Sequence, residues 1–451
     1  MQGEIIRDLD GGLLMRRASR EDAEPLTSHN ATMFRPHEAE ADPENAAWTR
    51  DLMTCPHPTF RPEDFLLVVE ASSGRIVSAA CWLDQTWTYA GIPFAVGRPE
   101  LVSTLPEYRN RGLVRALFEE LHRWSAERGQ LVQAITGIPY FYRRFGYEMT
   151  IQLDAGRSGP KAGIHLLETR EPAPYRVRPA AEADLDFIRA VYTLGSERSL
   201  VACSRDAAFW RYELLGRDPK SCVRLEFRVI ESSSGSPVGF LAHEARLDWP
   251  SFRLALYELR EGASWAAITP TVLRYLVETG EEYGERDREW RRWTGSPTEL
   301  EDISYSLGLE HPAYQFVKAA LPREHSPYAW YVRVPDLPAF LRLVTPALER
   351  RLAESAFVGH TGELKLSFYG SGVRLAFQEG RLAMVEPWRP IDGDRGSARF
   401  PDLTFLHLLF GHRALAELEH AFADCRGADD TTRALLGALF PKQASDIWPI
   451  A

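Results

Sequence analysis

Two stretches of this 451-residue chain recur at the same spacing, which constrains the fold more than any single motif. Residues 177–184 resemble residues 15–22, and residues 307–310 resemble residues 145–148, both at an offset of 162 positions. A shared offset indicates an internal duplication, so two similar units should follow one another along the chain. Each copy also contains two strand patterns around a Ser/Gly turn, which is typical of a β-hairpin.

The first copy predicts a mixed sheet that is crossed by one amphipathic helix. Apolar stretches at 65–70, 76–82 and 131–135 have the length and bounding turns of strands. Between them, the stretch 113–127 places leucines and a tryptophan on one face at helical spacing, with charged residues on the other faces. Strands followed by a helix and a further strand predict an α/β unit.

The chain after residue 325 has a different pattern. A helix is expected over 337–352, and the apolar stretches 363–369, 373–378 and 382–385 predict a small antiparallel meander. We therefore expect an α/β (α+β) protein with three domains, at 1–155, 156–325 and 326–451. The apolar character of the last residues indicates that the C-terminal tail docks on the protein, because a free terminus is usually polar.

One motif carries chemistry. In residues 102–114 a short apolar stretch leads into an Arg-x-x-Gly turn, from Arg109 to Gly112, and the turn opens the helix. The N-terminus of a helix presents unpaired N–H groups and a positive dipole end, which together favour an anion such as a pyrophosphate. The second copy has residues 266–273 at this point and lacks the turn. We therefore expect one anion site and a second copy with a structural role.

Composition and charge argue against several classes of protein. A net charge of −10 without a basic stripe argues against nucleic acid as a partner. No apolar run approaches the ~18 residues of a membrane span, and no signal peptide is recognisable at the N-terminus. The five cysteines are scattered without metal or redox spacing, so we expect a reduced, cytoplasmic protein without a metal site.

Residues 109–114 resemble the acyl-CoA pyrophosphate turn of the GNAT N-acetyltransferase superfamily, with Val114 at a position that is usually small. The further pattern over residues 102–122 and 142–147 is similar to the Eis (enhanced intracellular survival) acetyltransferases. That resemblance implies two tandem GNAT domains, the second without a cofactor site, and a C-terminal domain similar to sterol carrier protein. It also implies transfer of an acetyl group from acetyl-CoA to a primary amine of an aminoglycoside, a polyamine or a lysine.

The resemblance also implies the catalytic groups. Tyr142 matches the general acid that protonates the departing CoA thiolate, with Tyr140 and Tyr147 as rivals for this role. A phenol of pKa ~10 stays protonated at neutral pH and can serve as such an acid. The base implied by the family is the terminal carboxylate, here that of Ala451. Glu100 is the competing base. It stands at the start of the apolar strand that leads into the Arg-x-x-Gly turn, where other GNAT enzymes often hold a carboxylate.

The remaining candidate residues concern the two substrates. We expect backbone groups of the strand before the Arg-x-x-Gly turn to bind pantetheine, and the turn itself to bind pyrophosphate. The candidates are Val102, Ser103, Thr104, Arg109, Arg111, Gly112, Leu113 and Val114. Carboxylates and aromatic rings suit a cationic amine, and the candidates are Phe34, Trp82, Asp84, Trp87 and Glu100. No Cys or Ser has a recognisable nucleophile-and-base arrangement, which favours direct attack of the amine over an acyl-enzyme.

Two alternatives from other classes remain open. A lipid or sterol carrier would need a continuous apolar tunnel in the third domain, and it would not explain the Arg-x-x-Gly turn. A protein that binds CoA as a sensor or scaffold would keep the turn without turnover. The resemblance also implies a homo-oligomer, a hexamer in the family, although nothing in the sequence fixes the number of subunits.

Overall fold

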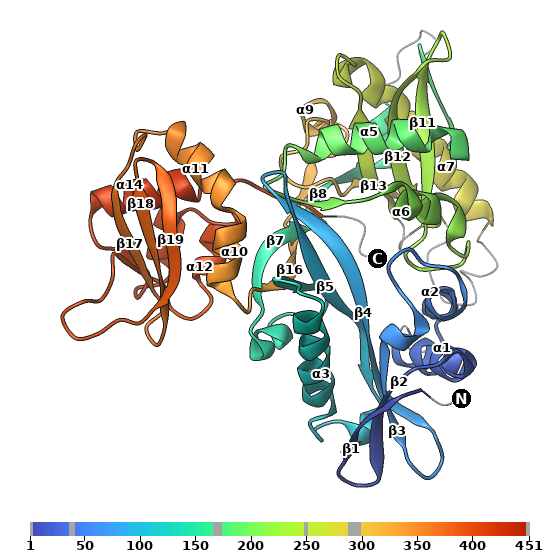
Figure 1. The fold of residues 1–451 in the computed structure, drawn as a ribbon. Helices are drawn as coiled ribbons and strands as arrows, with labels where there is room; N and C mark the ends of the chain where they lie inside the picture. Colours follow the sequence, from blue (N-terminus) through green and yellow to red (C-terminus); the bar gives the residue numbers. More distant parts are fainter. Residues whose placement is uncertain (1–2, 36–40, 166–173, 248–250, 287–298, 448–451) are drawn as a thin grey trace.

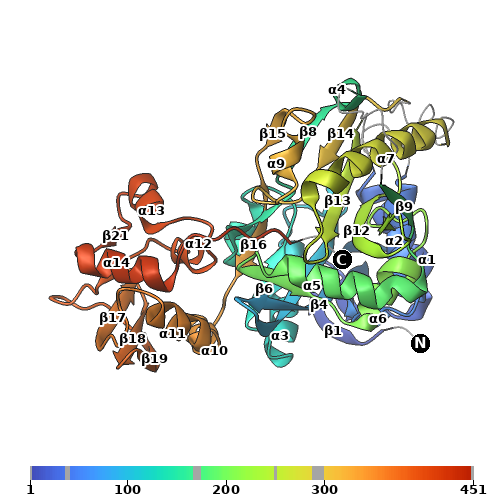
Figure 2. The ribbon, with the colours of Figure 1, turned by 90° about the horizontal axis from the view of Figure 1, so that it is seen from above.

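The structure, a computed structural model, describes residues 3–35, 41–165, 174–247, 251–286 and 299–447. It contains three β-sheets, each with helices packed against it, and Figures 1 and 2 show the unit around the third sheet set to one side of the other two. None of the described helices is both long and apolar enough to cross a membrane. The predicted α/β class, with two similar units and a smaller third unit, is confirmed.

The first sheet runs in the order β1-β2-β3-β4-β5-β6-β16-β7, with β10 added beside β4. Its strands are β1 (Ile5–Leu9), β2 (Leu13–Arg17), β3 (Phe65–Glu70), β4 (Ile76–Tyr89), β5 (Ile92–Thr104), β6 (Val132–Ile135), β7 (Glu148–Leu153), β10 (Val201–Ser204) and β16 (Tyr328–Arg333). The helices α1 (Ala23–Met33) and α2 (Pro43–Thr54) cover one face, and α3 (Leu113–Glu127) covers the other.

Helix α3 forms where the periodicity predicts it. Leu113, Leu117, Leu121 and Trp124 are buried against the sheet, and the helix begins after Gly112. Gly112 has φ +77°, a left-handed conformation that glycine adopts without the strain a side chain would bring. The glycine of the Arg-x-x-Gly turn therefore sets the direction in which the helix starts.

The second sheet has the order β15-β8-β14-β13-β12-β11-β9. Its strands are β8 (Gly156–Pro160), β9 (Tyr175–Pro179), β11 (Leu225–Ser232), β12 (Pro237–Glu244), β13 (Ser251–Leu259), β14 (Asp302–Tyr305) and β15 (Arg323–His325). One face packs against α5 (Leu185–Ser196) and α6 (Ala207–Arg211), and the other against α7 (Trp265–Arg286) and α9 (Tyr314–Val317); α4 (Lys161–His165) lies beside α7. Taken in reverse, from β9 to β15, this order corresponds to that of the first sheet from β2 to β7, which supports the inferred duplication.

The two sheets exchange strands. β8 follows the last strand of the first unit but lies between β14 and β15 of the second sheet. In return, β16 leaves the second unit and lies between β6 and β7 of the first sheet. The expected boundaries at 155/156 and 325/326 fall directly before these strands. The placement of β16 in the first sheet was not anticipated, because its neighbours lie far away in sequence.

The third sheet has the order β19-β18-β17-β20-β21. Its strands are β17 (Gly362–Ser367), β18 (Gly372–Gln378), β19 (Arg381–Trp388), β20 (Ala398–Arg399) and β21 (Arg426–Gly427), and the helices of this unit are α10 (Leu337–Leu343), α11 (Thr345–Ala353), α12 (Phe405–Leu409), α13 (Leu415–Ala421) and α14 (Asp430–Leu439). One sheet face packs on the helices. The other carries ion pairs such as Lys365–Asp394 and Arg374–Glu386.

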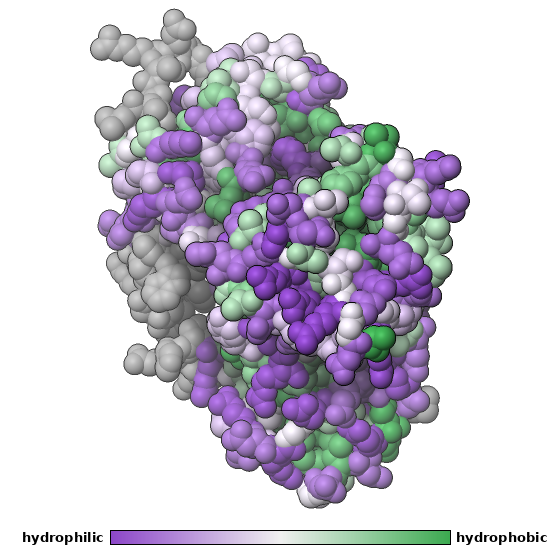
Figure 3. All heavy atoms as spheres, turned by 90° about the vertical axis from the view of Figure 1, so that its left-hand side faces the viewer, coloured by the Kyte–Doolittle hydropathy of each residue, from purple (hydrophilic) through white to green (hydrophobic). Residues whose placement is uncertain are grey.

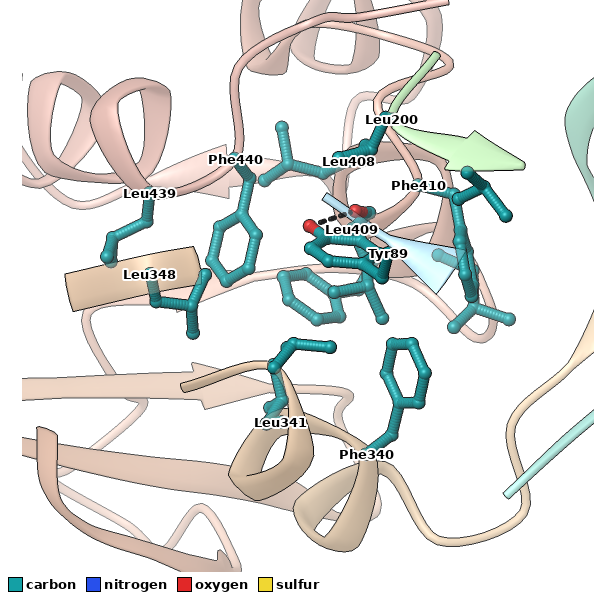
Figure 4. Packing of buried hydrophobic residues seen from close by; sticks show 14 of the residues in the cluster. Tyr89, Leu200, Phe340, Leu341, Leu348, Leu408, Leu409, Phe410, Leu439 and Phe440 are labelled. Atoms are coloured by element: carbon teal, nitrogen blue, oxygen red, sulfur yellow. Dashed lines mark hydrogen bonds between the residues drawn. The ribbon is translucent and has the colours of Figure 1, made fainter. Parts of the chain in front are cut away.

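The tip of the long β4–β5 hairpin is buried in the core of the third unit. Tyr89 is fully buried among aromatic and leucine side chains, and its hydroxyl donates a hydrogen bond of 2.8 Å to the carbonyl of Leu409 (Figure 4). The edge of the Tyr89 ring meets Phe340 at a centroid distance of 5.9 Å. The first and third units therefore share one core.

This core bears on the lipid-carrier alternative. Buried Phe and Leu side chains of the third sheet, its helices and the hairpin tip occupy the described interior of the third unit. The outer surface on this side mixes hydrophilic side chains with small hydrophobic patches (Figure 3). A carrier needs an apolar cavity of ligand size, whereas these side chains pack against one another in this core.

Replacing Tyr89 with alanine tests the shared core. Loss of a buried aromatic ring and of its hydrogen bond should lower the free energy of unfolding by about 4 kcal/mol. Urea unfolding followed by circular dichroism measures this change. Val358→Ala in the same unit is the control, because Val358 is 70% exposed and its truncation should change stability little. Equal free energies of unfolding for the two variants would contradict a stabilising role of the Tyr89 side chain in the shared core.

Candidate active site

In the first sheet β5 and β6 diverge, and the open edge of β5 beyond their pairing is called the cleft below. The two strands pair in parallel over only two residue pairs, Val96–Val132 and Gly97–Gln133. β5 then continues to Thr104 with a described partner on its β4 side only. Its other edge therefore offers backbone N–H and C=O groups along the cleft, and an extended ligand can pair with such an edge as an added strand.

A β-bulge interrupts β5 at the middle of this open edge. Ser103 pairs with Ala79 and Glu100 pairs with Cys81, so Leu101 and Val102 together face Ala80. Leu101 is a buried non-glycine residue with φ +51°. A bulge bends the strand and turns local backbone groups away from the ladder, a device common beside active sites. Backbone N–H groups at this bend can therefore point into the cleft.

The start of α3 lies beyond the end of β5. Its first N–H groups have no partner within the helix, as at every helix N-terminus. The Nε of Arg109 donates to the carbonyl of Thr104 at 3.4 Å. The guanidinium of Arg111 lies 5.2 Å from the centroid of the Tyr108 ring and beside Gly11 of the β1–β2 turn. Both arginines are exposed, so the turn combines two cations with free amide groups.

Hydroxyl groups hold the end of β5 in place. Ser78 of β4 donates to the carbonyl of Ser103 at 2.6 Å, and its oxygen lies 2.7 Å from the Thr104 hydroxyl. The Oγ of Ser103 lies 2.9 Å from Nε2 of His29 on α1. Burial lowers the pKa of His29 to about 4, so its imidazole is neutral at pH 7. The end of β5 is therefore held by contacts with β4 and α1, and its edge toward the cleft stays open.

Tyr142 lies on the short 3-10 helix η4 (Phe141–Phe145), which packs against α3. Its ring is buried and lies 5.9 Å from that of Tyr331. Its hydroxyl makes no hydrogen bond to any described residue, and it lies so close to Gly137 that a Cβ there would be 3.1 Å away. Burial first, and then the negative charge of Glu100, raises the pKa of Tyr142. The phenol is therefore protonated at neutral pH.

The two rival tyrosines have other environments. Tyr140 is 73% exposed. Tyr147 is fully buried, and its hydroxyl lies 2.8 Å from Nε2 of His122. Among the three, Tyr142 alone combines a buried ring with a hydroxyl that no other side chain holds, so the geometry favours Tyr142 as a proton donor.

Glu100 forms a buried ion pair with Arg98. Nη2 of Arg98 donates to Oε2 of Glu100 at 2.7 Å, and the side chain of Glu100 is 15% exposed. The guanidinium of Arg98 also stacks on Trp330 of β16, 4.5 Å from the ring centroid. Burial raises the pKa of Glu100, and the charge of Arg98 opposes this rise. Its carboxylate is a candidate base because it is near Tyr142 and carries an elevated pKa.

The C-terminal tail approaches this ion pair. Its residues pass between the first sheet and the second unit, where Oγ of Ser445 accepts a hydrogen bond of 2.8 Å from the N–H of Val201. The carbonyl of the buried Ile447 accepts a hydrogen bond of 3.0 Å from Nε1 of Trp330, the residue on which Arg98 stacks. Ala451, the expected source of the terminal carboxylate, lies outside the described residues.

The candidate amine-binding residues do not come together. Trp82 is fully buried against α3 and donates to Gln130, and Asp84 accepts hydrogen bonds from Arg128 and Gln130. Phe34 is half-buried at the end of α1, and Trp87 is fully buried against Trp330. These side chains have structural partners. Of the candidates for the amine site, Glu100 alone is close enough to Tyr142 to raise its pKa.

Arg98 and Trp330 were missed at the sequence level. Arg98 could have been found, because residues two apart in a strand share a face and the Arg-x-Glu spacing places opposite charges together. Trp330 had no sequence signal, since its neighbours come from a strand exchange. The bulge at Leu101 had none either, because no glycine marks it.

Part of the chain is similar to a known protein family. Residues 15–150 match the family model described as an acetyltransferase (GNAT) domain. A search of curated proteins by sequence finds no match. The chain thus contains a GNAT N-acetyltransferase domain, and enzymes of this family use acyl-CoA donors.

Solved structures resemble the whole chain at low sequence identity. A probable N-acyltransferase from Enterococcus faecalis V583 superposes with a TM-score of 0.66 at 14% identity, over 97% of this chain and 100% of that one. A GCN5-related N-acetyltransferase from Kribbella flavida gives 0.63 at 18% identity, over 97% and 100%. Eis1 from Mycobacterium abscessus gives 0.59 at 14% identity, over 96% and 98%. These likenesses show a shared fold along the chain.

His29 should make the protein sensitive to acid. Its pKa is about 4 in the folded chain and 6.5 in the unfolded one, so the unfolded state binds more protons between these values. This group alone should lower stability by about 3 kcal/mol as the pH drops from 6.5 to 4 and contribute no pH dependence above 6.5. The lowered pKa values of His57, His122, His243 and His412 add to the fall. Urea unfolding of the wild type and of His29→Gln across this range measures the effect. The variant should lose less stability than the wild type, and His420→Gln, at an exposed position, should behave like the wild type. An unchanged slope in His29→Gln would contradict the assignment.

Proposed function

We propose that this chain transfers an acetyl group from acetyl-CoA directly to a primary amine, as an Eis-like enzyme with its single active site in the first unit. The observation that carries the proposal is the convergence of three features at one cleft. They are the unpaired edge of β5, the N-terminus of α3 and the unbonded hydroxyl of Tyr142.

The donor fits this cleft by its chemistry. Pantetheine carries amide groups that can pair with the backbone of Val102 and Thr104 along the open strand edge. The pyrophosphate would bind the first N–H groups of α3, with Arg109 and Arg111 supplying positive charge. An N–H group at the bulge, that of Val102 or Ser103, would stabilise the negative charge on the thioester oxygen during attack.

The transfer needs a base and an acid. The acceptor ammonium first loses a proton to a carboxylate, and the free amine then attacks the thioester carbon. As the carbon–sulfur bond breaks, the CoA thiolate takes the proton of Tyr142, and the surplus proton on the nitrogen of the new amide passes through water to the tyrosinate, which restores the phenol. The phenol is protonated at neutral pH, so its proton is available when the thiolate forms. We propose the Ala451 carboxylate as the base, with Glu100 as its competitor.

Two features support a cationic acceptor. The carboxylate of Glu100, although paired with Arg98, lies near Tyr142, and the chain as a whole carries a net charge of −10. An ammonium group is drawn to both. The acceptor class that follows is a primary amine of an aminoglycoside, a polyamine or a lysine side chain.

The proposal assigns supporting roles to the rest of the chain. We assign residues 156–325 to a degenerate GNAT domain, because α7 begins at Trp265 without an Arg-x-x-Gly turn. We assign residues 326–451 to a sterol carrier protein-like domain that delivers the tail to the cleft. We also propose a homo-oligomer, a hexamer by the Eis resemblance, in the cytoplasm, where free thiols such as those of Cys81 and Cys203 stay reduced. Light scattering of the purified chain measures the number of subunits.

Replacing Tyr142 with phenylalanine tests the acid. Removal of the hydroxyl should lower kcat about a hundredfold and leave KM for acetyl-CoA nearly unchanged, because the ring and its packing remain. The assay is CoA release with a panel of amines. Tyr140→Phe is the matched control and should keep its rate. Tight CoA binding by the wild type without turnover on any amine would instead favour a sensor or scaffold.

Removing Ala451 tests the base. Deletion moves the terminal carboxylate by one residue, so kcat should fall about a hundredfold if this group takes the proton. Glu100→Gln should reduce kcat less and raise KM for the amine, since it removes an attracting charge. The shortened chain keeps the buried Ile447. The melting temperature of the shortened chain is the control for its folding. An unchanged rate after deletion, together with loss of activity in Glu100→Gln, would assign the base to Glu100.

A further inference from the structure

A second pocket lies between the first sheet and the helices of the third unit. It has a volume of about 620 Å³, within the range of small-molecule sites. Its walls come from the residues before and within η4, from β7 and β16, and from α12 and α13 with the segments that follow each of them. None of the lining residues belongs to β5 or α3. The pocket is therefore separate from the acyl-CoA cleft.

Aromatic and apolar side chains make up about half of the lining residues, and charged residues and histidines make up the rest. Tyr328 and Tyr331 form one wall, and Met149 and Leu418 add aliphatic surface. Tyr140 and Phe422, which are 73% and 38% exposed, also line the pocket. Large hydrophobic side chains that converge on a concave surface mark binding sites more often than scattered ones do.

The backbone at Tyr140 is strained, and this is an independent sign of function. Tyr140 has φ +61° and ψ −12°, a left-handed conformation that a bulky side chain seldom adopts. The hydroxyl of Tyr331 accepts a hydrogen bond of 2.9 Å from its N–H and holds it there. Such strain gathers at ligand-binding segments. Here it directs an exposed aromatic ring to the pocket.

The charged groups of the pocket are balanced. Glu148 is buried and pairs with Arg143 at 2.6 Å, and His407 lies 3.5 Å from it. Glu417 on α13 lies beside Arg413 at 3.7 Å. A cationic ligand would meet the two arginines, and an anionic ligand would meet the two glutamates. A neutral ligand with a large apolar surface avoids both penalties.

We propose that this pocket is a second small-molecule site, which binds a neutral and mainly apolar ligand that carries an aromatic ring. Offset or edge-to-face contacts with the tyrosines would hold such a ring. The site also touches the catalytic segment, because Tyr331 contacts the Tyr142 ring and holds the backbone of Tyr140.

The test uses N-phenyl-1-naphthylamine, a neutral aromatic probe whose fluorescence rises in apolar surroundings. Titration into the full chain, with and without saturating CoA, should give a saturable signal that CoA does not displace. Ala421→Trp places a large side chain at the exposed edge of the pocket and should weaken binding at least tenfold. Phe422→Glu, which puts a charge there, should do the same.

Val358→Trp is the matched control, because it adds the same side chain at an exposed position of the third unit that does not line the pocket. It should bind the probe like the wild type. Acetyl-CoA binding should be unchanged in all three variants, which separates this proposal from the acetyltransferase assignment. Equal probe affinity in Ala421→Trp and Val358→Trp, displacement by CoA, or no saturable signal would overturn it.

Discussion

The β4–β5 hairpin links the three units because different parts of it are buried in different cores. Near its base, Cys81 and Trp82 belong to the two cores on either face of the first sheet. Farther along, Thr86–Tyr89 pairs with β10 from the second unit. At the tip, Tyr89 is enclosed by the third unit. β5, which forms the open edge of the cleft, pairs along its other edge with the anchored strand β4, so the cleft has a rigid wall.

The same arrangement explains how a charged pair is tolerated inside the protein. Arg98 has no exposed surface, and burial of an isolated guanidinium would be costly. Its contacts with Glu100 and with the Trp330 ring offset part of that cost. Because β16 follows the second unit along the chain, and the carbonyl of Ile447 accepts a hydrogen bond from Trp330, the environment of Glu100 depends on the folding of the whole chain.

Local patterns predicted much of this structure. Helix α3, the Gly112 turn and the hairpins follow from periodicity and turn chemistry, and the duplication follows from a common offset. Site candidates such as Arg109 and Tyr142 could be named from short local motifs, and their roles stay predictions. Features that depend on distant pairings were not: the insertion of β16, the burial of Tyr89 and the bulge at Leu101 arise from tertiary packing. Trp82 and Asp84 show the same limit, because their partners Gln130 and Arg128 lie more than forty residues away.

The strand exchange between the first two sheets has a consequence for biosynthesis. β7 can reach its place at the edge of the first sheet only when β16 is present beside β6. The ribosome delivers β16 after the entire second unit, so the first sheet waits with an unpaired edge while its duplicate is made. Unpaired edges invite association with other chains. β8, already sequestered in the second sheet by then, ties the waiting edge to a folded neighbour. The duplicate can thus act as an intramolecular chaperone for the catalytic unit.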